Sequence, residues 1–143
     1  MERRTVLKAL AVAGALPTLT AEAFTGSADT AGAAVYELRV YTTYEGKLDD
    51  LLKRFREHTM ALFERHGMKN VAYWTASEAP LAGKTLVYIL RHPSREAATA
   101  NWKAFQDDPE WQQVRNKSEE AGKIVEKVDS TFMALTDFSP KIG

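Results

Sequence analysis

Thr85-Leu-Val-Tyr-Ile-Leu-Arg91 is the stretch of sequence that decides the fold. Its five central residues are all apolar, and successive side chains of an extended chain point to opposite faces. A strand with one wet face alternates between polar and apolar residues, which this stretch does not do. We therefore expect a strand at the centre of a sheet, covered on both sides.

The segments next to this strand predict a hairpin on one side and a helix on the other. Residues 71–77 are typical of a second strand, and residues 79–83 (Ala-Pro-Leu-Ala-Gly) of the loop that joins the two strands. After the central strand, Ser94 is a good N-cap for a helix. That helix carries Ala98, Trp102 and Phe105 on one side.

Further out, the pattern predicts two more helices and two more strands. Asp108, followed by proline, starts a helix that ends near residue 122. Residues 129–136 form the last strand and residues 35–42 the first. Between the first two strands, apolar residues at helical spacing predict a helix over 47–66, which Gly67 ends in a left-handed conformation.

The resulting order is β-α-β-β-α-β, an α+β sandwich of ferredoxin-like type. Two helices on one side leave the opposite sheet face uncovered. Exposing several large apolar side chains there costs about 25 cal/mol per Å². We expect a second copy of the chain to cover that face, which gives a homodimeric α+β barrel. The alternative is a monomer whose outer face is polar.

The first 34 residues predict export. Residues 1–23 combine Arg3-Arg4, a short apolar run and small residues near Ala23, the parts of a signal peptide of twin-arginine type. An ordinary export signal and an amphipathic helix are the alternatives. The apolar run is too short to span a membrane. Residues 24–34 are small and polar, typical of a flexible leader. We expect a periplasmic or secreted protein.

Composition narrows the possible partners. Removing residues 1–23 takes away three basic and two acidic side chains and leaves 16 basic against 17 acidic. This balance argues against nucleic acid as a partner, because phosphate binding needs clustered Lys and Arg. The chain has no cysteine. Disulfides, thiolate metal sites and thiol nucleophiles are therefore excluded.

Residues 35–140 resemble the NIPSNAP domain over essentially their whole length. The motifs that carry the resemblance are Tyr36-Glu37-Leu38-Arg39-x-Tyr41, Gly46-Lys47, Phe55 and His58, Leu62-Phe63-x-Arg65-His66-Gly67-Met68, Val71-x-Tyr73-Trp74, Leu86-Val87-Tyr88-Ile89-Leu90, Ser94-Arg95, Trp102-x-x-Phe105-x-x-Asp108-Pro109-Glu110-Trp111, Ser118-Glu119 and Phe138-Ser139-Pro140. Glu45 departs from the family, which often has proline before the Gly-Lys turn. The resemblance implies a dimeric α+β barrel and assigns no reaction.

Six side chains are candidates for a ligand pocket between helix and sheet: His58, Tyr36, Trp74, Tyr88, Trp102 and Phe105. His58 lies three residues after Phe55 and four before Leu62, so helical spacing turns its imidazole toward the sheet. Aromatic side chains beside it would line a pocket for a flat apolar ligand. The alternatives are a buried histidine with a local hydrogen-bond partner, and aromatic residues that fill the core or a dimer interface.

Other polar residues give weaker signals. Glu37 and Arg39 are interpreted as an ion pair, with pocket polar groups as the alternative. His92 stands before a proline at a strand end, where we expect it to be solvated. The chain has no HExxH motif or other metal-ligand spacing, no nucleotide loop and no nucleophile motif, so we expect no metal and no cofactor.

Three functions remain open from the sequence. The first is a homodimer that binds a small apolar or aromatic ligand. The second is a cofactor-independent enzyme, such as a monooxygenase or isomerase, which rests on analogy between folds. The third is a protein-interaction module. The sequence does not decide whether the protein is an enzyme.

Overall fold

The computed structural model describes residues 34–142. The predicted signal peptide, residues 1–23, and the leader up to residue 33 lie outside the described residues. Within residues 34–142, no helix is both long and apolar enough to cross a membrane. The elements are β1 (Val35–Thr43), α2 (Leu48–Arg54), η1 (Phe55–Thr59), α3 (Met60–Arg65), β2 (Lys69–Thr75), β3 (Thr85–His92), α4 (Arg95–Asp107), α5 (Pro109–Ser118) and β4 (Val125–Met133).

The four strands form one antiparallel sheet in the order β2-β3-β1-β4. The two central strands are β1 and β3, which pair along their length with Leu38 opposite Ile89. The predicted central position of the 85–91 strand is confirmed. Element order and strand order together confirm the predicted ferredoxin-like α+β fold.

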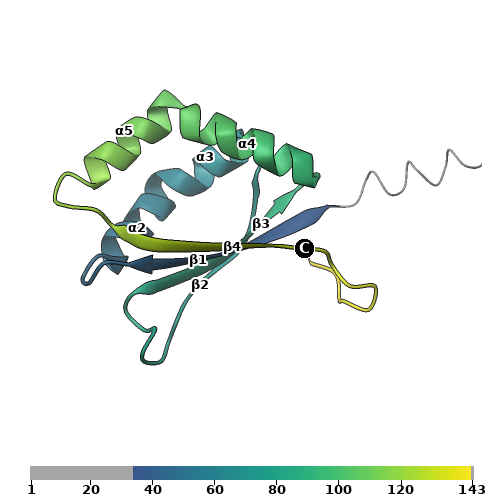
Figure 1. Ribbon diagram of the computed structural model, residues 1–143, viewed down its shortest axis with the longest axis horizontal. Helices are drawn as coiled ribbons and strands as arrows, with labels where there is room; N and C mark the ends of the chain where they lie inside the picture. Colours follow the sequence, from purple (N-terminus) through teal and green to yellow (C-terminus); the bar gives the residue numbers. More distant parts are fainter. Residues whose placement is uncertain (1–33, 143) are drawn as a thin grey trace, which may run out of the picture. The chain divides into compact units, whose positions relative to one another are not determined.

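All of the described helices lie on one side of the sheet (Figure 1). Between this helical layer and the sheet lies the core, which is rich in aromatic rings: Tyr41, Leu51, Phe55, Leu62, Phe63, Met68, Leu86, Tyr88, Leu90, Phe105, Trp111 and Ile124. No helix of residues 34–142 lies on the opposite side of the sheet (Figure 1). The side chains that alternate with the core positions therefore face outward there. We call this surface the open face; it includes Leu38, Val40, Trp74, Val87 and Ile89.

The helix between β1 and β2 contains a π-helical turn, η1. A π turn closes i→i+5 hydrogen bonds and holds one residue more than an α-helical turn, so it shifts the residues that face the core. Thr59 is 1% exposed here, and His58 is exposed. The prediction that the His58 imidazole points toward the sheet is therefore wrong. Uniform α-helical spacing does not reveal the extra residue.

Capping residues mark the other helix ends as predicted. The Ser94 side chain accepts a hydrogen bond from the Ala97 amide at the start of α4, and Asp108 accepts one from Glu110 at the start of α5. Gly67 has φ +80, which confirms the left-handed stop.

The last strand begins four residues earlier than predicted. It runs over Val125–Met133 instead of 129–136. Its end is set by its partner, because β1 begins at Val35 and Met133 pairs with Tyr36. Residues beyond Met133 have no strand to pair with, although they are as apolar as the residues before them.

Candidate functional site

Strand β1 carries charged side chains into the space beneath the helices. Glu37, Arg39 and Tyr41 alternate along the strand on its helix-covered face. Glu37 is 1% exposed and Arg39 is 14% exposed, and their Oε2 and Nη1 atoms lie 2.7 Å apart. The predicted ion pair is confirmed, and it is buried. Buried charges are costly unless they are paired and hydrogen-bonded, so the surrounding contacts decide what this pair can do.

Four donors occupy both oxygens of the Glu37 carboxylate. Oε1 accepts hydrogen bonds from His92 Nε2 at 2.9 Å and from Trp102 Nε1 at 2.7 Å. Oε2 accepts from Arg39 and from Ser130 Oγ, the latter at 2.6 Å. Burial raises the pKa of Glu37, but these four hydrogen bonds together outweigh it and hold the pKa at about 2. The carboxylate is thus charged at neutral pH and too weakly basic there to take a proton.

Arg39 is held in a fixed orientation by its neighbours. Its Nε donates to Tyr88 Oη at 3.0 Å and its Nη2 to Tyr41 Oη at 3.2 Å. The guanidinium lies over the Trp102 ring, 4.2 Å from its centroid. Burial lowers the pKa of Arg39, but contacts with Tyr41, Tyr88 and Glu37 raise it by more, so the pKa lies above its usual value and the group stays cationic. A guanidinium has five N–H donors, of which these residues use three.

His92 was expected at a solvated strand end, and that prediction is wrong. Its side chain is 0% exposed, and its Nε2 donates to Glu37. Its Nδ1 is buried without a hydrogen-bond partner. The last residue of β3 still faces the core, because strand parity sets it on the same side as Tyr88 and Leu90.

Of the cluster of Glu37, Arg39, Tyr88, His92, Trp102 and Ser130, only Ser130 is exposed, at the β4 edge of the sheet, and Arg39 and Trp102 are partly exposed. Val128 and Ser130 lie on the helix-covered side, opposite Tyr41 and Arg39 of β1. Both are nevertheless exposed, and Val128 reaches 44%. The helices therefore cover β1 and β3 but leave this side of β4 open. A small molecule approaching there would meet Ser130 first and Arg39 behind it.

The structure brings together three of the six predicted pocket residues. Tyr88 and Trp102 belong to the charged cluster, and the Phe105 ring packs edge-on against Trp102 with centroids 5.6 Å apart. Tyr36 and Trp74 lie on the open face, and His58 on the helix surface. Tyr88 and Phe105 are 0% and 3% exposed, so both rings serve as core packing.

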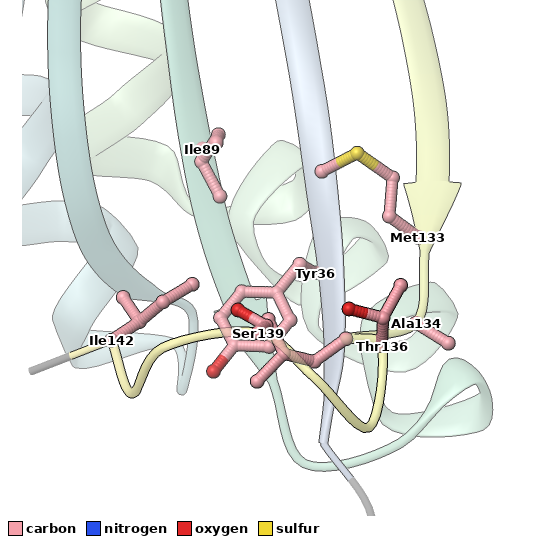
Figure 2. A pocket seen from close by; sticks show the side chains of 8 residues that line it. Tyr36, Ile89, Met133, Ala134, Thr136, Ser139 and Ile142 are labelled. Carbon is pink, nitrogen blue, oxygen red and sulfur yellow. The ribbon is translucent and has the colours of Figure 1, made fainter.

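Two hollows lie elsewhere. One, of about 210 Å³, is on the open face at the end of the sheet, where the segment after β4 folds back over Tyr36 and Ile89 (Figure 2). Its remaining lining is Met133, Ala134, Leu135, Thr136, Ser139 and Ile142. The other, of about 500 Å³, is a groove between α2–η1 and α5 that includes His58. Tyr36 thus lines an apolar hollow, and His58 lines a polar one.

The NIPSNAP family model matches residues 36–140. The chain belongs to the NIPSNAP family. Among solved structures, a NIPSNAP-like domain protein from Burkholderia xenovorans is 16% identical with a TM-score of 0.67, and the match covers 78% of this chain and 93% of that one. None of the curated proteins matches.

Two further structures share the fold of this NIPSNAP domain. A NIPSNAP family protein of unknown function from Agrobacterium tumefaciens is 21% identical, with a TM-score of 0.65 and coverage of 76% of this chain and 94% of that one. SnoaB, a cofactor-independent oxygenase from Streptomyces nogalater, is 14% identical, with a TM-score of 0.51 and coverage of 76% and 99%. At these identities the similarity shows the fold alone.

Sequence reasoning missed the centre of the cluster. The sequence predicts Glu37 and Arg39 as an ion pair. No local sequence pattern links this pair to His92 or Ser130, which lie far away along the chain. The alternation of side chains along β1 contains a signal for this cluster. Glu37 and Arg39 share a strand face with Tyr41, and Tyr41 is a core residue. Opposite charges on the core side of a central strand indicate a buried pair in need of further partners.

Proposed function

We propose that the protein is an exported homodimer that binds a small apolar or aromatic ligand between its helices and its sheet. The observation that carries the ligand site is Arg39, a buried cation with unused N–H groups. It lies next to the part of β4 that faces the helical layer but that no helix covers. The ligand accordingly carries one oxygen that Arg39 can bind, such as a carboxylate or phenol oxygen. Phe132 and Val128 supply apolar contact along β4.

The open face supports the homodimer. Leu38, Val40, Val87 and Ile89 form two adjacent apolar pairs across β1 and β3. Trp74, opposite Val87 on β2, is 50% exposed. An apolar sheet face of this kind is buried in a symmetric pair when two copies pack face to face. Homodimers of this type are also typical of the NIPSNAP family.

A titration with 2-naphthoate, a flat aromatic carboxylate, tests the ligand site. The protein has three tryptophans, so its indole N–H signals can be assigned by NMR with Trp74→Phe and Trp111→Phe. We expect a saturable shift of the Trp102 indole signal, because that N–H lies in the same cluster as Arg39. Val128→Tyr, which narrows the approach along β4, should weaken binding about 10-fold. A shift confined to Trp74 would instead put the ligand on the open face.

Export is a separate part of the proposal and rests on the sequence of residues 1–23. Replacing Arg3 and Arg4 by lysine keeps the positive charge but removes the paired arginines. We expect the variant to accumulate unprocessed in the cytoplasm of its host, measured by cell fractionation. Normal processing of the double variant would rule out the twin-arginine route.

A cofactor-independent oxygenase is the second candidate. It is favoured by the fold shared with SnoaB and by the Nδ1 atom of His92, a buried lone pair with no donor. In this second candidate His92 is the proton acceptor, because both oxygens of Glu37 already accept two hydrogen bonds each. Oxygen uptake with a substituted hydroquinone should then exceed the buffer rate and be lost in His92→Gln. Equal uptake by both proteins would eliminate this candidate.

A further inference from the structure

We propose that the groove between α2–η1 and α5 is a second binding site, for a small molecule with a single carboxylate or phosphate group, and that Arg54 binds that group. The groove measures about 500 Å³, within the range of small-molecule sites. It is lined by side chains of α2, η1 and α5 and by the turn after α5: Asp50, Lys53, Arg54, Glu57, His58, Gln113, Val114, Lys117, Ser118, Glu120 and Ala121. This inference does not depend on the site beside β4.

The Arg54 side chain carries the argument. It is only 5% exposed, and its Nη1 donates to Ser118 Oγ at 3.1 Å and lies 3.5 Å from Glu119 Oε2. Its guanidinium is 5.2 Å from the centroid of the Trp111 ring. The Nε atom, however, is buried with no acceptor. Arg54 thus presents an unsatisfied charged donor next to a groove.

An unsatisfied buried donor has an energetic consequence. Leaving such a group without a partner is unfavourable, and more so when it is charged. Burial lowers the pKa of Arg54, opposed mainly by Glu119, so its present contacts do not fully compensate the lost hydration. An anionic oxygen of a ligand would complete the hydrogen bonding of the guanidinium.

The π turn lies directly after Arg54. Thr59 Oγ1 donates to the Arg54 carbonyl at 3.3 Å, at the point where the regular helical pattern is interrupted. Single π turns within α-helices occur frequently at functional sites. In this protein the turn leaves Thr59 in the core and His58 at the groove. Regular helical spacing would bury His58. The π turn instead places His58 in the lining of the groove, which Arg54 also lines.

Charge around the groove defines the class of ligand. Lys53, Arg54 and Lys117 are balanced by Asp50, Glu57 and Glu120. A polyanion such as nucleic acid gains nothing from this balance, because its binding requires an excess of basic groups. A molecule with one anionic group and a polar or zwitterionic remainder fits the mixed lining.

The test is a titration of the full chain with two probes, inorganic phosphate and acetate, while the arginine Nε–H signals are recorded by NMR. We expect the Arg54 Nε–H signal to shift saturably, and the probe that saturates at the lower concentration identifies the chemical class. Lys117→Met should weaken binding about 10-fold. Ala121→Trp, an exposed substitution that fills the groove without changing charge, should abolish binding.

The matched control is Lys103→Met. Lys103 is an exposed lysine of α4 that pairs with Asp107 and does not line the groove, so its removal should leave the titration unchanged. The proposal fails if neither probe moves the Arg54 signal. It also fails if Lys103→Met and Lys117→Met weaken binding equally, because the effect would then be a general response to lost charge.

Discussion

At the scale of single residues, Glu37 determines the electrostatics of the site beside β4. Its two oxygens accept four hydrogen bonds, and its partners come from β1, β3, α4 and β4. The carboxylate therefore acts by fixing Arg39 and Trp102, and it has no role as a base. Because strands and a helix meet at this one side chain, its ionisation is linked to the stability of the fold.

Glu37→Gln should change how stability depends on pH. The pKa of Glu37 in the folded protein, about 2, lies below its ordinary value of 4.5. The charged carboxylate therefore stabilises the fold above pH 4.5, and this contribution, about 3 kcal/mol, is lost as the pH falls toward 2. Urea unfolding should show that loss in the wild type and a flatter profile in Glu37→Gln.

At neutral pH the same variant leaves Arg39 buried without its counter-ion. We expect its free energy of unfolding to drop by about 3–5 kcal/mol. Glu78→Gln, a change at an exposed loop residue, is the control and should match the wild type. Identical pH profiles for all three proteins would show that Glu37 is not ionised in the buried pair.

Individual side chains were the hardest feature to predict from the sequence. Helical spacing placed His58 inward, and one additional residue in a π turn placed Thr59 there instead. His92 faces the core because side chains alternate along β3. Its hydrogen-bond partner there, Glu37, is 55 residues away in the sequence. Burial of a polar residue depends on such distant partners, which local patterns do not contain.

At the scale of elements, Asp108 joins two parts of the helical layer. It caps α5 through the Glu110 amide, and its Oδ2 lies 2.7 Å from His66 Nε2 and 3.3 Å from Arg65 Nη2. His66 and Arg65 belong to the end of the helix that begins at α2. One carboxylate thus fixes the start of one helix against the end of another.

Asp108→Ala should destabilise the protein by about 1–2 kcal/mol, as expected for loss of an N-cap. Asp107→Ala is a matched control. The Asp107 carboxylate is next to Asp108 in the sequence but is exposed, and it pairs with Lys103 on the same helix. Thermal unfolding followed by circular dichroism compares the two. Equal melting temperatures for the two variants would contradict the capping role.

The elements themselves were largely predictable. Ser94, Asp108 and Gly67 mark helix ends through local hydrogen bonds and backbone conformation, and all three behave as expected. The start and end of β4 were not predictable in the same way. An edge strand extends only as far as the strand it pairs with. Because β4 is antiparallel to β1, the end of β4 at Met133 is set by the start of β1.

At the scale of the whole molecule, the sheet has one face covered by helices and one face open (Figure 1). The order of elements was enough to predict this arrangement, because two crossover helices of the same hand pack on the same side. The order does not determine what covers the open face. Ile89 and Leu38 lie opposite each other at its centre. They are therefore the positions where a charge would most disturb a second copy.

Sedimentation equilibrium at micromolar concentration, of the wild type and Ile89→Lys, tests whether the open face is the interface of a homodimer. We predict a wild-type particle of twice the protomer mass, and a folded single protomer for Ile89→Lys, because a lysine at the middle of the open face would be buried without a partner. Circular dichroism would confirm that the variant keeps its fold. A wild-type protein that sediments as a single protomer would contradict the account.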